Sequence, residues 1–232
     1  MFKKISLFIA GVFFQHWALS SQIFSALPDE INPQHKYIFY SHGYIVEGDN
    51  PKPVHHSWGV YDYPEILVAM SNKGTNVISE HRAAKTNPYK HAQKLTEQVN
   101  YLIGKGVPSG NITLIGFSRG GFITAITSSY LKNKKINYVI LAACTSGLGK
   151  DEDVKLYGHV LSIFETSDTV GSCNEVVKRN PQSISSFTEI SISTGAEHGA
   201  FYRPIPEWVN PVKTWIDFGP QEKVKGFSKK RF

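Results

Sequence analysis

The sequence predicts an α/β fold, with a mostly parallel sheet of about six strands and helices on both faces. Segments typical of strands alternate with segments of helical periodicity along the chain, which is the pattern of such folds. The 232 residues, 41% hydrophobic and 19% charged, are enough for one domain with a sizeable core. In a parallel sheet the loops that follow the strands emerge at one edge, where ligands bind.

The predicted strands are short apolar runs bounded by turn residues, and they cover residues 37–40, 76–80, 111–115, 138–142, 160–164 and 187–192. Helices are predicted over residues 64–71, 89–103, 120–131 and 207–217. The second helix has its apolar face at Leu95, Val99, Leu102 and Ile103. Pro211 predicts a kink or an early end of the last helix, because proline lacks the amide hydrogen that a helix needs.

Both chain ends are predicted to lie outside the folded domain, which spans residues 21–219. Residues 1–20 combine a positive start, an apolar run and small residues at Ala18 and Ser20, the plan of a secretory signal peptide. The apolar run is too short for a membrane anchor, since Gln15 and His16 end it. The chain is therefore expected to be exported, to the periplasm or outside the cell, with no stable membrane anchor.

The net charge of +6 comes from the two ends of the chain. Residues 21–220 carry 18 basic and 18 acidic side chains, so the body of the protein is neutral. It contains no basic stripe interleaved with aromatic residues, and nucleic acid is not an expected partner. Residues 220–232 are expected to form a flexible basic tail.

The two cysteines, Cys144 and Cys173, are predicted to form a disulfide, because an exported chain meets an oxidising environment. Two buried free thiols are the alternative. Neither cysteine has the spacing of a metal ligand. Both follow neighbouring strands, so a disulfide would join two loops at the ligand-binding edge of the sheet.

The stretch LIGFSRGGFITA, residues 114–125, has the spacing G-x-S-x-G at Gly116, Ser118 and Gly120. It follows a predicted strand and opens a predicted helix, so Ser118 is expected on a sharp turn with its hydroxyl exposed above the sheet. The N-terminus of that helix favours developing negative charge. Ser118 is therefore a candidate nucleophile, and a plain glycine turn with an incidental serine is the alternative.

A serine nucleophile needs a base, and a histidine on the same sheet edge supplies one when an acidic side chain orients it. Only His159 and His198 follow Ser118 in the chain. His159 begins a strand and so lies at the wrong edge, whereas His198 lies in the loop after the last strand. Asp168, in the loop after the preceding strand, is preferred as the acid over Glu165, which ends that strand.

The candidate nucleophile, acid and base occur in the order Ser118, Asp168, His198, which resembles the α/β-hydrolase superfamily. The resemblance covers about residues 37–218. It implies a small exported serine hydrolase. No recognisable antiparallel strands precede the first predicted strand, so a trimmed version of the α/β-hydrolase fold is expected. The predicted lid region is short, which argues against lipase action on fat droplets.

The superfamily usually has a His-Gly loop after an early strand, and YSHGYIVEG provides one at His42 and Gly43. The resemblance implies that the backbone N–H groups of Tyr44 and Arg119 form the oxyanion hole. The loop does not read HGGG, which argues against the esterases related to hormone-sensitive lipase.

The long loop after Gly43 contains His55, His56 and Trp58, which either line the pocket or fold that loop over the sheet. A zinc site made by His42 with the two other histidines has no supporting spacing and is not expected.

Together these residues predict a serine hydrolase acting on an acyl ester, or a related acyl bond, of a small soluble substrate, with no cofactor and no metal. Ser118 would attack the carbonyl, His198 would transfer the proton and Asp168 would orient His198. An acyltransferase or a peptidase using the same triad, and a non-catalytic binding protein, are the alternatives. Arg119 and Arg203 are weaker candidates for holding an acidic group of the substrate. The sequence does not indicate an oligomeric state.

Overall fold

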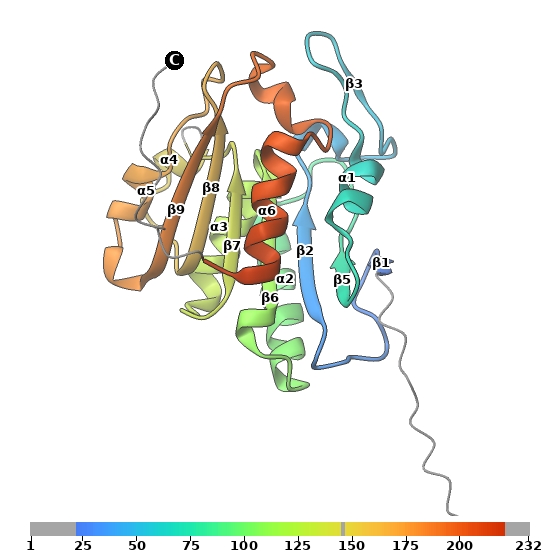
Figure 1. Ribbon diagram of the computed structural model, residues 1–232, viewed down its shortest axis with the longest axis vertical. Coiled ribbons are helices and arrows are strands. Elements are labelled where there is room, and N and C mark those ends of the chain that lie inside the picture. The colour runs from blue at the N-terminus through green and yellow to red at the C-terminus, as the bar shows by residue number, and fades with distance from the viewer. Residues whose placement is uncertain (1–21, 145–146, 221–232) are drawn as a thin grey trace, which may run out of the picture.

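The protein is built around a seven-stranded sheet with the strand order β1-β5-β2-β6-β7-β8-β9 (Figure 1). The computed structural model describes residues 22–144 and 147–220. The strands are β1 (Gln22–Phe24), β2 (Lys36–Ser41), β5 (Thr75–Ile78), β6 (Ile112–Phe117), β7 (Asn137–Leu141), β8 (Gly158–Glu165) and β9 (Ile184–Ile192). All neighbouring strands in this sheet are parallel, which confirms the predicted sheet type. The predicted signal peptide lies outside the described residues, as does the basic tail beyond Pro220.

Helices cover both faces of the sheet (Figure 1). On one face lie α1 (Tyr63–Met70) and α6 (Pro206–Phe218), and on the other lie α2 (Pro88–Gly104) and α3 (Arg119–Leu131). Side chains alternate along each strand, so Ile115 of β6 packs toward α1 and α6, whereas Leu114 packs toward α2 and α3. Two short helices, α4 (Gly147–Lys150) and α5 (Asn174–Lys178), lie near the β8–β9 side of the sheet.

The fold differs from the prediction at β1 and at α6. The sequence does not reveal β1, because only three residues pair with β5 at the edge of the sheet. The last helix continues through Pro211, so the early end, one of the two outcomes predicted for this proline, does not occur. Trp208, Val212 and Trp215 bury α6 against the sheet, and this packing offsets the hydrogen bond that proline cannot make.

The long loop after β2 contains η1 (Tyr44–Val46) and an antiparallel hairpin formed by β3 (Val54–His55) and β4 (Gly59–Val60). In Figure 1 this hairpin rises beyond the carboxyl ends of the strands, at the top of the view. The hairpin therefore stands at the edge where the loops after the strands gather.

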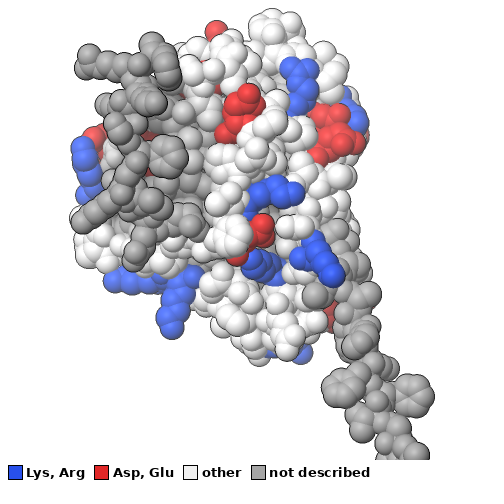
Figure 2. Space-filling model, viewed as in Figure 1, with Lys and Arg blue, Asp and Glu red and all other residues white. Residues whose placement is uncertain are grey.

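Among the described residues, no helix combines the length and apolar character needed to cross a membrane. On the face shown in Figure 2, acidic and basic side chains are interspersed over the described surface. This distribution matches the charge balance of the chain between its two ends.

Candidate active site

Ser118 lies on the turn between β6 and α3, at the carboxyl edge of the sheet. Its backbone has φ 53° and ψ −118°, a conformation that residues other than glycine rarely adopt. Two hydrogen bonds fix the turn: the Ser118 amide donates to the Leu141 carbonyl at 2.9 Å, and the Phe122 amide donates to the Ser118 carbonyl at 3.0 Å. The turn therefore holds Ser118 at the N-terminus of α3, where unpaired helix amides favour negative charge.

Three glycines make this sharp turn possible, because backbones approach closely around it. A Cβ atom on Gly116 would lie 2.2 Å from the carbonyl oxygen of Gly120, and one on Gly120 would lie 1.8 Å from that of Ser41. A Cβ on Gly121 would lie 2.5 Å from the Cβ of Ala143. Non-bonded atoms cannot approach so closely, so only glycine fits at these positions.

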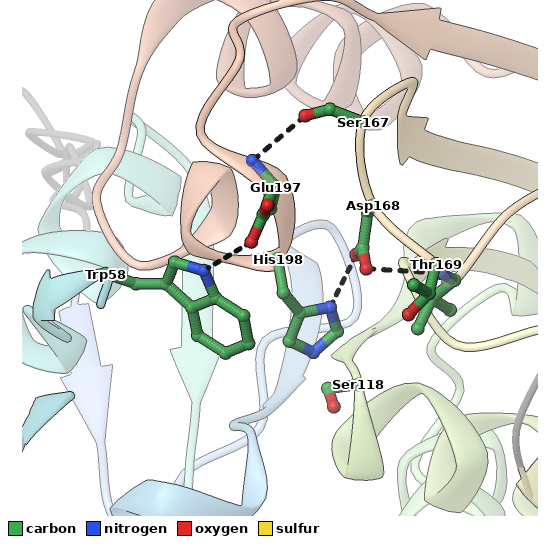
Figure 3. A pocket seen from close by; sticks show the side chains of 8 residues that line it. Trp58, Ser118, Ser167, Asp168, Thr169, Glu197 and His198 are labelled. Carbon is green, nitrogen blue, oxygen red and sulfur yellow. Dashed lines mark hydrogen bonds and ion pairs between the residues drawn. The ribbon is translucent and has the colours of Figure 1, made fainter. Parts of the chain in front are cut away.

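His198 and Asp168 are joined by a hydrogen bond of 2.6 Å between Nδ1 and Oδ2 (Figure 3). Asp168 lies in the loop after β8, and His198 lies in η4 (Glu197–Phe201), after β9. Their side chains are 4% and 13% exposed. The other oxygen of Asp168 accepts from the Val170 amide at 3.1 Å, which fixes the carboxylate. An aspartate carboxylate accepts hydrogen bonds, so Nδ1 of His198 is the donor in this pair, and Nε2 is the ring nitrogen left to face the cleft.

The His198 ring lies between Asp168 and Ser118 in Figure 3. The Ser118 hydroxyl is turned away from the ring in that view, and rotation about its Cα–Cβ bond changes its direction between staggered positions. A cleft of about 290 Å³ opens over these side chains, and its lining residues are Trp58, Ser118, Ser167, Asp168, Thr169, Val170, Glu197 and His198. The structure thus brings the three candidate side chains of the sequence prediction into one cleft.

Glu165, the alternative acid, has a different environment. It is fully buried at the end of β8. Its Oε2 accepts from the amide of Ser167 at 2.7 Å and from the hydroxyl of that residue. Its Oε1 accepts from the amides of Thr194 and Gly195 at 2.8 and 3.2 Å. Burial alone would raise the pKa of Glu165, but these hydrogen bonds outweigh it and hold the pKa below its ordinary value of 4.5. Glu165 therefore ties the loop after β8 to the loop after β9.

The loop after β2 brings a backbone amide to the turn. A Cβ on Gly43 would lie 3.9 Å from the Cβ of Ser118, so this loop passes directly beside the serine. Tyr44 is the first residue of η1, and Arg119 is the first residue of α3. Neither backbone N–H has a hydrogen-bond acceptor within the described part of the chain. Both N–H groups are therefore available to an oxygen atom bound beside Ser118.

His42, at the end of β2, is fully buried. Its Nε2 accepts from the Arg82 amide at 2.9 Å, and its Nδ1 donates to the Gly43 carbonyl at 2.8 Å. Burial and the neighbouring Arg82 guanidinium lower the pKa of His42 to about 2. The imidazole therefore stays neutral near pH 7 and joins the loop after β2 to the segment after β5.

A buried ion cluster fixes the same loop to the turn. Glu47, whose side chain is 2% exposed, accepts from Arg82 Nε at 3.3 Å and from Arg119 Nε at 2.9 Å. Arg119 also donates from Nη2 to the Thr86 carbonyl at 2.7 Å, and its guanidinium lies 5.2 Å from the ring centroid of Tyr44. The side chain of Arg119 thus joins the loop after β2, the segment after β5 and α3. One carboxylate balances only one of the two guanidinium groups, so the cluster is positively charged.

The β3–β4 hairpin forms one wall of the cleft. Trp58 Nε1 donates to Glu197 Oε2 at 3.1 Å (Figure 3). Trp58 also packs directly against Gly199, and only glycine allows this approach, because a Cβ at that position would lie 2.5 Å from the Cβ of Trp58. The Trp58 ring stacks on His55 with centroids 4.1 Å apart, and His56 packs against His55 at 4.4 Å. Of these three hairpin residues, Trp58 therefore lines the cleft, and the two histidines pack behind it.

The predicted disulfide between Cys144 and Cys173 is present, with Cα atoms 5.0 Å apart. Cys144 follows β7 and Cys173 immediately precedes α5, so the bond joins the loops after two neighbouring strands. The carboxylate of Glu189 on β9 accepts from the Cys173 amide at 2.7 Å, which fixes the far side of the loop. The disulfide and this hydrogen bond secure the segment that follows Asp168.

Among the described residues, no group of three or more histidine, cysteine, aspartate or glutamate side chains is arranged to hold a metal ion. Arg203 lies beside the hairpin, since a Cβ on Gly59 would be 3.8 Å from its Nη1. Sequence reasoning does not single out Glu47, Arg82 or Glu197. For Glu47 the only signal is a carboxylate between the apolar YIV and a glycine, shortly after the His-Gly pair.

No protein-family model matches the chain, and no curated protein is significantly similar in sequence. Solved structures match in fold. Est1E from Butyrivibrio proteoclasticus aligns with a TM-score of 0.55 and 11% identity, over 85% of this chain and 90% of its own. SOBER1 from Arabidopsis thaliana aligns with a TM-score of 0.52 and 11% identity, over 79% and 98%. The esterase RhEst1 from Rhodococcus sp. ECU1013 aligns with a TM-score of 0.51 and 13% identity, over 82% and 93%. Together with the parallel sheet and its helices on both faces, these likenesses show that the chain has the α/β-hydrolase fold.

Proposed function

We propose that the protein is a serine hydrolase that cleaves an acyl ester of a small substrate through an acyl-enzyme. The observation that supports this most is the 2.6 Å hydrogen bond between His198 and Asp168 in the cleft that also contains Ser118. A serine on a strand-to-helix turn, followed in the chain by an acid and a histidine on later loops, is the usual arrangement for this chemistry. The esterase RhEst1 has the same fold, which supports the proposal by analogy.

In the proposed reaction, Ser118 Oγ attacks the carbonyl carbon and its proton passes to His198 Nε2. Asp168 keeps Nδ1 protonated and stabilises the imidazolium that forms. The amides of Tyr44 and Arg119 bind the oxyanion of the tetrahedral intermediate. The bond to the leaving alcohol then breaks, and the alcohol oxygen takes the proton from Nε2. A water molecule repeats these steps on the acyl-enzyme, releasing the carboxylic acid and regenerating the serine.

The size of the site supports a small substrate. The cleft of about 290 Å³ is near the lower limit for small-molecule sites. Between β7 and β8 the described residues form one helix, α4, of four residues, which is much smaller than a lipase lid. We also propose that the protein is exported, and the Cys144–Cys173 disulfide supports an oxidising compartment.

The test is a panel of short activated esters offered to the purified protein lacking its first 20 residues. Ser118→Ala should lower kcat/KM by at least about 10³-fold, because it removes the hydroxyl that lies on the turn beside the Tyr44 and Arg119 amides. The matched control is Ser71→Ala, at the end of α1 and away from the cleft, which should retain wild-type turnover. Unchanged turnover in Ser118→Ala would refute the proposal.

Two further measurements separate the alternatives. A fluorophosphonate probe should label the wild type at Ser118 and leave Ser118→Ala unlabelled. If the wild type is not labelled either, a binding protein is favoured. Mass analysis of products formed with an added alcohol or amine separates hydrolysis from acyl transfer, because only an acyltransferase accumulates the new ester or amide.

A further inference from the structure

A second cavity, of about 480 Å³, is bounded by the loop after β2, the hairpin and the segment after β5. Its lining residues are Tyr44, Ile45, Glu47, His55, Ala84 and Lys85, and none of them lines the cleft at Ser118. The roles assigned so far to Ser118, Asp168 and His198 make no use of this cavity.

The second cavity adjoins the reacting centre. Tyr44, whose amide is a proposed oxyanion donor, lines it, and the preceding residue Gly43 lies beside Ser118. On the hairpin, His55 lines the second cavity and stacks on Trp58, which lines the cleft. The two spaces therefore adjoin at the turn at Tyr44 and at this stacked pair of rings.

The chemistry of acyl transfer assigns the two spaces to different parts of the substrate, provided that the proposed function holds. The leaving alcohol must lie against His198 Nε2, because that atom protonates it, so the alcohol occupies the cleft. The carbonyl oxygen must point at the amides of Tyr44 and Arg119. The acyl chain is the remaining substituent of the carbonyl carbon. It therefore extends away from His198 and from the alcohol, and the second cavity adjoins the reacting centre on the Tyr44 side.

Positive charge predominates around the second cavity when the groups behind its lining are included. Glu47 is the one acidic residue among those lining it, and Arg82 and Arg119 both donate to the same carboxylate oxygen of Glu47. Lys85 is exposed and has no ion-pair partner among the described residues. The lining and the groups directly behind it thus carry three positive charges and one negative charge.

Lys85 is held in place by the same contacts that fix the turn. Its backbone has φ 60°, a left-handed conformation that costs a residue with a side chain some free energy. The carbonyl of the next residue, Thr86, accepts from Arg119 Nη2 at 2.7 Å, so the segment carrying Lys85 is tied to the residue after Ser118. The ammonium group is therefore attached at the rim of the cavity by a backbone that the fold constrains.

We propose that the second cavity is the acyl subsite and that it selects acyl groups with a negatively charged far end, such as half-esters of short dicarboxylic acids. The carbonyl carbon binds between Ser118 and the two amides. The acyl chain runs past the Tyr44 ring, and the terminal carboxylate meets Lys85 and the Arg119 guanidinium. This assignment also gives Arg119 two separate roles, one through its backbone amide and one through its side chain.

The test compares two esters with the same leaving group and the same chain length: mono-4-nitrophenyl glutarate, which is anionic, and its methyl ester, which is neutral. Spontaneous hydrolysis is subtracted, and the readout is the ratio of kcat/KM for the anionic ester to that for the neutral ester. We expect a wild-type ratio of at least about fivefold at low salt, falling toward one at high salt as the charges are screened.

Lys85→Met should lower this ratio by at least about threefold, because the substitution removes the charge and keeps an unbranched side chain. The matched control is Lys132→Met at the end of α3, an exposed lysine with φ 50°, which should leave the ratio unchanged. A wild-type ratio of one or below, or a ratio that Lys85→Met does not alter, would overturn the subsite assignment. Turnover of the neutral ester in the same experiment would still support the proposed hydrolase. Absence of turnover of both esters by the wild type would overturn the proposed function itself.

Discussion

Replacing Glu165 by glutamine removes one acceptor oxygen and one charge from a buried carboxylate that receives four hydrogen bonds. If the amide oxygen faces the Thr194 and Gly195 amides, the new NH₂ group faces the Ser167 amide and the Ser167 hydroxyl, and that hydroxyl can turn to accept from it. The Ser167 amide is then left unsatisfied, which costs about 1–3 kcal/mol. We expect Glu165→Gln to lower the free energy of unfolding by that amount, measured by urea denaturation.

Glu189→Gln is the matched control. The Glu189 carboxylate accepts from Ser172 Oγ, the Cys173 amide and Asn174 Nδ2. Like Glu165 it is a carboxylate with several donors, but it is half-buried and its donors lie in the segment before α5. Both variants should lose stability. Only Glu165→Gln should also lose ester turnover under conditions where the variant is still folded, because Glu165 bonds to the loops that carry Asp168 and His198, whereas Glu189 bonds to residues 172–174.

The pH dependence of this effect has a defined sign. The pKa of Glu165 is lowered in the folded state, so its contribution to stability is complete above its ordinary value of 4.5 and is lost as the pH falls through the folded-state value. The stability gap between the wild type and Glu165→Gln should therefore narrow on acidification below 4.5. A gap that stays constant on acidification, or a variant as stable and active as the wild type, would refute this account of Glu165.

The close approaches and the disulfide give further predictions. Gly120→Ala should cost at least about 3 kcal/mol or prevent folding, because the new Cβ meets the Ser41 carbonyl at 1.8 Å. Its control is Gly104→Ala in α2, which has nothing within 4 Å of the new Cβ. This control should raise the free energy of unfolding by about 0.5–1 kcal/mol, measured by thermal unfolding. The double variant Cys144→Ala/Cys173→Ala should lose about 3–4 kcal/mol, since the bond closes a separation of 29 residues. Reductant should destabilise the wild type by a similar amount and leave the double variant unaffected. A Gly120→Ala protein of wild-type stability would contradict the close packing at the turn.

The parallel sheet could be predicted because its central strands carry their signal locally. Every residue of β6 is buried, and a strand buried on both faces reads as a continuous apolar run. The edge strand β1 has no such signal, because its three residues are held by pairing with β5 and two of them are exposed. The continuation of α6 through Pro211 is a tertiary effect, in which burial of Trp208 and Trp215 outweighs a local helix-breaking preference.

The residues of the candidate site could be predicted from their positions in the loops that follow the strands. Asp168 and Glu165 differ by three positions, and only the residue beyond the strand end reaches the imidazole of His198. The ion cluster could not be predicted in this way. Glu47 contacts Arg82 and Arg119, which lie 35 and 72 residues further along the chain, and no local pattern records such pairs.

The turn at Ser118 is held by its main chain and by the Arg119 side chain. Its amide and carbonyl are hydrogen-bonded, glycines allow the neighbouring backbones to approach, and the serine side chain makes no capping hydrogen bond to α3. The backbone conformation of the turn therefore does not depend on which side chain occupies position 118. Cysteine there would point in the same direction as the serine, and alanine would keep the turn but remove the reactive hydroxyl. The glycines of the G-x-S-x-G pattern thus indicate the sharp turn, and the residue between them determines which nucleophile the turn presents.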